Sequence, residues 1–242
     1  MLTTLCLTTI EVMSLDFRSV NLLTAQRKAK VLFEEIETRR LIRPAVSEKV
    51  INTEIHTLAH ELFGIKKYWH KRIVRVGPNT LFPYRENPPD RLVQEDDIVF
   101  LDFGPIFEEW EADFGRTYVL GDDPVKHRLK SDVELLWQRG KELFDQHTEL
   151  PAKELFSCMR QAALEAGYSW GSLHCGHLIG QFPHENIPRD QMSGFIHGDN
   201  KTILQAPDEH GAQRHWILEV HITIPERSIG AFHEQLLTVS DS

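Results

Sequence analysis

Two aspartates within apolar segments are the residues of this 242-residue chain whose type and spacing first suggest chemistry. Asp102 lies in Ile98-Val-Phe-Leu-Asp-Phe-Gly104, and Asp113 lies in Ala112-Asp-Phe-Gly-Arg-Thr-Tyr118. An unpaired buried carboxylate is penalised heavily by desolvation, so each aspartate must be paired, hydrogen-bonded, protonated or bound to a metal. If the two segments pair as antiparallel strands, both carboxylates can lie on one sheet face and share cations.

The aspartate pair taken alone has an equally good structural interpretation. Each acid could pair with an arginine such as Arg116, or it could be solvated at a strand end, where carboxylates are common. The other acids and histidines of the chain favour the metal site.

One histidine and two glutamates extend the set. His177 lies between glycines in His174-Cys-Gly-His-Leu-Ile-Gly180, and His184 follows seven residues later. Glu219 and Glu234 each lie in a run apolar enough to form a buried strand. Any one of them could be structural, but four carboxylates and one histidine in a small domain would be hard to bury without cations.

In this order, the acids and the histidine resemble the metal-ligand set of the pita-bread metallopeptidases, the family of methionine aminopeptidase, aminopeptidase P and creatinase. The surrounding motifs Asp-Phe-Gly, Asp-Phe-Gly-Arg-Thr and Gly-His-Leu-Ile-Gly match as well, and the resemblance covers Ser47 to Val239. The resemblance implies an α+β fold in which helices cover a curved antiparallel sheet.

The resemblance also implies a centre of two divalent metal ions. Asp113 and Glu234 would bridge the two ions, and Asp102 would complete one site. His177 and Glu219 would complete the other site. Oxygen-dominated ligands with a single imidazole suit Mn(II), Fe(II) or Co(II), while Zn(II) stays open.

Such a centre would hydrolyse an amide bond. A water shared by two ions forms hydroxide at neutral pH and attacks a polarised carbonyl. The resemblance therefore implies an aminopeptidase that cleaves an N-terminal peptide bond, Xaa-Pro or related. It gives Glu219 a role as proton shuttle and His184 a role in stabilising the tetrahedral intermediate. A purely structural histidine is the alternative for His184.

The chain departs from the peptidases in the loop before Asp102, where they usually carry another histidine. Pro83 and Tyr84 occupy that position here. Tyr84 could donate a hydrogen bond to substrate, or His70 could reach in from a neighbouring segment, so both are candidate substrate-binding residues. For His70, a surface or interface position is the simpler interpretation.

Two other functions follow if the peptidase interpretation fails. One is a carbon-nitrogen hydrolase of a small metabolite, as in creatinase. The other is a catalytically inactive pita-bread binding module, because folds are reused for binding. Retention of all five ligand types argues against the binding module.

Composition limits the partners. A net charge of −9 argues against nucleic acid, and the chain lacks the apolar run of about 18 residues that crosses a membrane. Three scattered cysteines indicate a reducing, cytoplasmic setting. The expected partner is a peptide or small amide substrate, and the chain could form a homodimer. Met13 could be the true start.

The elements that must position these residues follow from periodicity and capping. Helices are predicted from about Asp16 to Leu41, from the N-cap Ser47 to Gly64, from Ser131 to His147 and from Pro151 to Ala166. Strands are predicted over Arg72–Val76, Ile98–Phe103 and Asp113–Leu120, with a β-rich remainder. We expect residues 1–46 to form an extension and helix packed on a core domain of residues 47–242.

Overall fold

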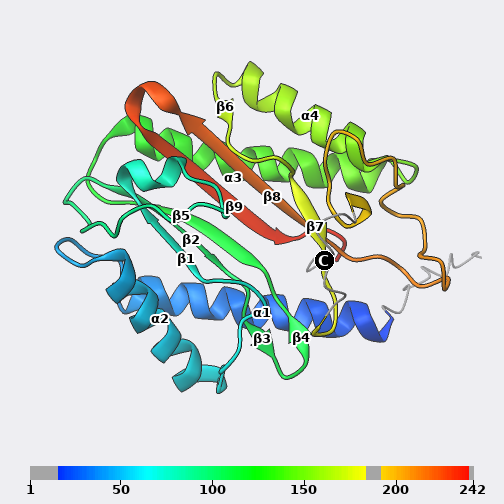
Figure 1. The fold of residues 1–242 in the computed structure, drawn as a ribbon, viewed down its shortest axis with the longest axis horizontal. Helices are drawn as coiled ribbons and strands as arrows, with labels where there is room; N and C mark the ends of the chain where they lie inside the picture. The colour runs from blue at the N-terminus through cyan, green and yellow to red at the C-terminus, as the bar shows by residue number, and fades with distance from the viewer. Residues whose placement is uncertain (1–15, 184–191, 240–242) are drawn as a thin grey trace, which may run out of the picture.

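A seven-stranded antiparallel sheet forms the centre of the structure, a computed structural model that describes residues 16–183 and 192–239 (Figure 1). The strands follow the order β1-β2-β5-β9-β8-β6, and β7 pairs with β8. Their bounds are β1 Ile73–Val76, β2 Ile98–Phe103, β5 Phe114–Val119, β6 Ser169–Trp170, β7 Gly176–Leu178, β8 Trp216–Ile224 and β9 Ile229–Leu236. A separate small hairpin joins β3, Ile106–Phe107, to β4, Trp110–Glu111.

Four α-helices accompany the sheet in the described part of the chain: α1 Phe17–Thr38, α2 Glu48–Phe63, α3 Pro124–Gln146 and α4 Ala152–Glu165. Capping side chains accept hydrogen bonds from backbone amides at the starts of α1, α2 and α3, as Ser47 does from Val50 at α2. Gly64 ends α2 in the left-handed conformation, as predicted. Helix α3 begins seven residues before the predicted Ser131, because Asp123 caps it and Pro124 suits its first turn.

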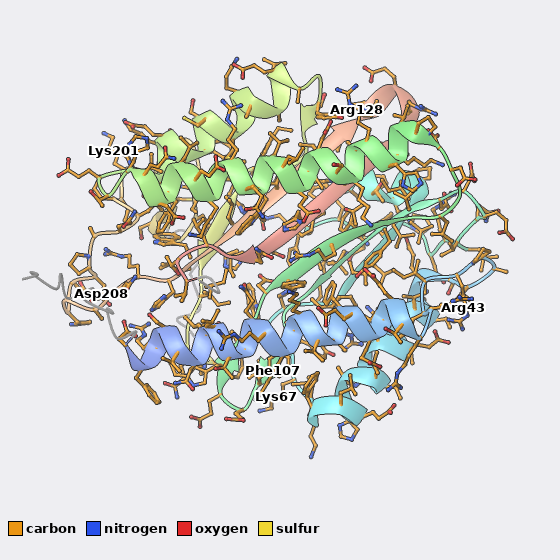
Figure 2. All side chains as sticks on the ribbon, turned by 180° about the vertical axis from the view of Figure 1, so that it is seen from behind. Arg43, Lys67, Phe107, Arg128, Lys201 and Asp208 are labelled. Atoms are coloured by element: carbon orange, nitrogen blue, oxygen red, sulfur yellow. The ribbon has the colours of Figure 1, made fainter. Side chains whose placement is uncertain are left out.

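The four helices lie on one face of the sheet. Seen from behind, α1 and α3 cross in front of the strands (Figure 2). Alternate residues of a strand point to opposite faces, so Leu218 and Val220 of β8 pack toward α3 and α4 in a buried core. Glu219 and His221 point the other way and line a cleft.

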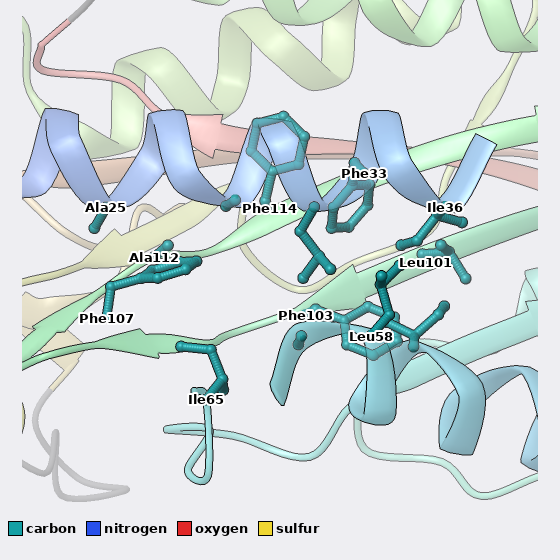
Figure 3. Close-up of a cluster of buried hydrophobic side chains, with 14 of the residues drawn as sticks. Ala25, Phe33, Ile36, Leu58, Ile65, Leu101, Phe103, Phe107, Ala112 and Phe114 are labelled. Atoms are coloured by element: carbon teal, nitrogen blue, oxygen red, sulfur yellow. The ribbon is translucent and has the colours of Figure 1, made fainter. Parts of the chain in front are cut away.

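A second buried core lies beneath α1 and α2 (Figure 3). Phe33 of α1 meets Phe114 of β5 edge to face, with ring centroids 4.8 Å apart, and Phe103 of β2 at 6.2 Å. Because α1 shares this core with strands of the main sheet, its packing holds β2 and β5 in place from the face opposite the cleft. The boundary between residues 46 and 47 stays a prediction.

The predicted α+β arrangement and the pairing of the two aspartate strands are confirmed. β2 and β5 pair antiparallel, and the connection between them contains the β3–β4 hairpin, which was not predicted from the sequence. None of the described helices combines the length and apolar character needed to span a membrane.

A substitution at Gly230 tests the close contact between β9 and the 3-10 helix Gly77–Leu81. The Gly230 amide donates to the Thr80 hydroxyl at 2.8 Å, and a Cβ on Gly230 would lie 2.5 Å from the Thr80 carbonyl oxygen. We expect Gly230→Ala to lower the free energy of unfolding by about 1–3 kcal/mol, measured by urea denaturation.

Gly198→Ala is the matched control, because its Cβ would meet only the Phe156 ring at 3.7 Å. We expect that variant to stay within about 0.5 kcal/mol of the parent. Equal stability of the two variants would contradict the proposed close contact.

Candidate metal centre

Three acidic side chains and a glycine form one row across four strands. Asp102 on β2 is opposite Gly115 on β5, and Gly115 is opposite Glu234 on β9. Glu234 is in turn opposite Glu219 on β8. Asp113 precedes Gly115 by two residues, so its side chain points to the same face. The strand register therefore gathers all four predicted carboxylate ligands on the face opposite the helices.

Gly115 allows β5 and β9 to lie close together at this row. A Cβ at that position would lie 2.5 Å from the Phe232 ring and 3.1 Å from the Cβ of Glu234. Any larger residue would push β9 away from β5. The glycine of the Asp-Phe-Gly-Arg-Thr motif thus brings Glu234 toward Asp102 and Asp113.

His177 approaches the acids from β7. Its Nε2 lies 3.0 Å from Asp113 Oδ2 and 3.8 Å from Glu234 Oε1. Its Nδ1 bonds to the Leu178 carbonyl oxygen at 2.8 Å, which fixes the ring. Gly176 has a φ of 151° and a Cβ there would collide with the Ile217 carbonyl, so β7 can lie this close to β8 only with glycine at that position.

His70 also lies in the centre, so the interpretation of it as a surface or interface residue is wrong. Its Nε2 lies 3.0 Å from Asp113 Oδ1 and 3.4 Å from Asp102 Oδ1, and its side chain is 6% exposed. The reason is local: a Cβ on Gly104 would collide with the Trp69 and His70 rings. Gly104 therefore opens the space that the histidine occupies.

The five predicted ligands are buried, with residue exposures from 2% for Glu234 to 9% for Glu219. Among residues 16–183 and 192–239, Asp102 Oδ1 and Glu234 Oε2 have no hydrogen-bond partner. Arg116 does not neutralise the acids, because its guanidinium donates to the backbone carbonyl of Glu234 and stacks 3.7 Å from the Phe114 ring. Buried acceptor oxygens of this kind fit divalent cations, and two such ions would balance four carboxylate charges.

The pKa values of these groups reflect burial and crowding. Burial, reinforced by the charge of Asp113, raises the pKa of Asp102 to about 7 and holds that of Glu234 well above its usual range. Burial acts in the same direction on Asp113, but His70 and His177 outweigh it and lower its pKa to about 2. Burial disfavours charge on His70, yet Asp113 and Asp102 raise its pKa to about 9. The site thus favours positive charge beside Asp113.

Two further residues of the site had no role assigned from sequence. His174 Nδ1 lies 3.0 Å from Glu219 Oε1, and its position three residues before His177 was the available signal. Trp69 lies beside both histidines, with ring centroids 4.5 Å from His70 and 5.1 Å from His177. His174 thus contacts the predicted ligand Glu219, and Trp69 contacts the rings of His70 and His177.

A cleft of about 750 Å³ opens over the acids. Its lining includes the aromatic side chains of Phe100 and Phe232 on the sheet and of Phe195, which follows the 3-10 helix Met192–Gly194. Tyr84 lies at the rim, and its hydroxyl accepts a hydrogen bond from the Lys71 amide at 3.3 Å. His184 and Met13 lie outside the described residues.

Known proteins resemble this chain in sequence and in fold. An Xaa-Pro dipeptidase from Lactobacillus delbrueckii subsp. lactis is 27% identical over 145 residues, which are 60% of this chain and 39% of that protein. A dipeptidase structure from Pyrococcus horikoshii OT3 aligns with a TM-score of 0.70 and 26% identity, over 93% of this chain and 61% of that chain.

The methionine aminopeptidase of Rickettsia prowazekii has a similar fold, with a TM-score of 0.68 at 19% identity, over 91% of this chain and 96% of that one. The predicted pita-bread fold is thereby confirmed. The chain spans less than two thirds of the length of the two dipeptidases.

One comparison covers almost the whole chain. Residues 21–241 match the sequence model of metallopeptidase family M24. This span includes every residue of the acidic row and both histidines that approach Asp113. The chain therefore belongs to metallopeptidase family M24.

Proposed function

We propose that this protein is a dinuclear metal-dependent peptidase that cleaves the N-terminal peptide bond of a short peptide. The observation that carries the proposal is the buried row of Asp102, Glu234 and Glu219, with Asp113 and His177 beside it, at the base of a cleft. Asp113 and Glu234 would bridge the two ions. Mn(II), Co(II) and Fe(II) are the metals we propose for this oxygen-rich set, with Zn(II) as a further option.

Two divalent ions, when bound, would lower the pKa of a water molecule and polarise the carbonyl group of the substrate. The protein's own residues then handle the protons. Glu219 is the candidate proton acceptor, and the His174 ring at 3.0 Å orients its carboxylate. His184 keeps its proposed role of stabilising the tetrahedral intermediate, a role that rests on the sequence resemblance.

We propose dipeptides or short peptides of the Xaa-Pro type as substrates. The name of the Lactobacillus relative supports this class, and the aromatic side chains of Phe100, Phe195 and Phe232 in the cleft lining suit an apolar ring. A small polar metabolite would gain less from these side chains. The homodimer and the cytoplasmic location stay predictions.

Removal of the bridging carboxylate should abolish activity. We expect Asp113→Asn to reduce the hydrolysis rate of an Xaa-Pro dipeptide such as Ala-Pro by roughly 100-fold or more in the presence of Mn(II) or Co(II), because the amide cannot bridge two cations. Steady-state kinetics and metal analysis of the same preparation measure both losses.

The matched control is Asp97→Asn, another buried aspartate, whose Oδ2 accepts from the Gln94 amide away from the acidic row. We expect it to keep its activity and its metal. Parental activity in Asp113→Asn would refute the dinuclear proposal, and a parental preparation with two ions but no Xaa-Pro hydrolysis would refute only the substrate.

Tyr84 should contribute to substrate binding. Its hydroxyl accepts from the Lys71 amide and still has its own proton to donate into the cleft. We expect Tyr84→Phe to raise KM roughly 2- to 10-fold with little change in kcat, because one hydrogen bond to substrate is lost.

Tyr168→Phe serves as control, since that hydroxyl donates to Asp132 of α3. A fall in kcat with unchanged KM in Tyr84→Phe would show that Tyr84 acts on the transition state instead.

A further inference from the structure

We propose that His70 is a sixth protein ligand of the metal centre and completes the site formed by Asp102 and Asp113. This inference rests on the dinuclear centre proposed above. It adds a nitrogen donor to the ion at the Asp102 site, which is the ion that His177 would not bind. Each ion would then be bound by one imidazole and by carboxylates.

The two histidines are arranged in the same way around Asp113. His177 directs Nε2 at Asp113 Oδ2, and His70 directs Nε2 at Asp113 Oδ1, both at 3.0 Å. Each ring also uses Nδ1 to bond the carbonyl of its next residue, at 2.8 Å for His177 and 2.7 Å for His70. A ring whose Nδ1–H donates to a backbone carbonyl presents Nε2 as a metal ligand, and this pattern is typical of ligating histidines.

The donor spacings around His70 fit a common ion. Its Nε2 lies 3.0 Å from Asp113 Oδ1 and 3.4 Å from Asp102 Oδ1. Donors about 2.1 Å from one ion are separated by about 3.0 Å in octahedral and about 3.4 Å in tetrahedral geometry. Asp102 Oδ1 has no hydrogen-bond partner in the described part of the chain, so it is available to bind a cation.

The surrounding residues hold His70 in this position. The Trp69 amide donates to the Gly104 carbonyl at 3.0 Å, and the Trp69 indole donates to the Ala112 carbonyl at 3.1 Å. These bonds tie the His70 segment to the ends of both aspartate strands. Gly104 supplies the space for the ring, as its Cβ would collide with it.

A substrate-binding role, which the sequence suggested for His70, fits this arrangement less well. His70 Nδ1 is hydrogen-bonded to the Lys71 carbonyl oxygen, and His70 Nε2 points at the two aspartates. Neither nitrogen is left to contact a peptide. The 6% exposure of the side chain agrees with a ligand at the base of the cleft.

A second imidazole changes which metals the centre prefers. Imidazole suits Co(II), Fe(II) and Zn(II), whereas sites of oxygen alone suit Mn(II) and Mg(II). His70 should therefore strengthen Co(II) binding at the Asp102 site more than Mn(II) binding.

Calorimetric titration of the metal-free protein with Co(II), and separately with Mn(II), tests the proposal. We expect the parent to bind two Co(II) ions, and His70→Gln to bind one of them at least about tenfold more weakly. We expect His70→Gln to lose less affinity for Mn(II) than for Co(II). His197→Gln is the control, a buried histidine whose Nε2 bonds to the Met192 carbonyl outside the cleft; it should bind both ions as the parent does.

Unchanged Co(II) binding by His70→Gln, with a raised KM, would overturn the proposal in favour of a substrate contact. A parent that binds no Co(II) would refute the dinuclear centre itself, so the two failures are distinguishable. X-ray absorption of the Co(II)-loaded parent needs no variant: one imidazole per ion supports the proposal, and one imidazole per two ions contradicts it.

Discussion

Four carboxylates buried on one face of a sheet are the constraint on which this structure depends. Asp102, Asp113, Glu219 and Glu234 are each less than a tenth exposed, and their mutual repulsion and desolvation would be costly without cations. Burial and this crowding raise the pKa of Asp102. The pKa of Asp113 is lowered instead, because Asp113 is the aspartate that contacts both His70 and His177. Positive charge at the centre relieves the repulsion.

The two faces of the sheet have separate roles in this fold. The helices bury their apolar sides on one face, which leaves the other free for polar chemistry. Antiparallel register then aligns acids from β2, β9 and β8, while glycines remove the side chains that would separate them. Gly104, Gly115 and Gly176 are all required by close approach, of His70, β9 and β7 respectively. The short motifs around the predicted ligands thus determine how closely these side chains approach one another as well as which side chains are present.

Much of the fold and most of the acidic row could be predicted from the sequence. Asp102 and Asp113 were recognisable because an acid within an apolar strand requires compensation, and the family resemblance supplied Glu219 and Glu234. For His70 the sequence offered both a position in the site and a position at the surface. It could not decide between them, since the choice depends on the hydrogen bonds of the Trp69 segment to Gly104 and Ala112, which are distant in sequence. The early start of α3 was missed because a cap and a proline outweighed the apolar pattern.

The most direct test of this account is a crystal structure of the protein grown with Mn(II), with anomalous diffraction used to locate the ions. We expect two anomalous peaks on the acidic face, both within bonding distance of Asp113 and Glu234, with Asp102 on one and His177 on the other. A single peak, or none, with those carboxylates hydrogen-bonded only to protein and water would contradict the claim that the row was built around two cations.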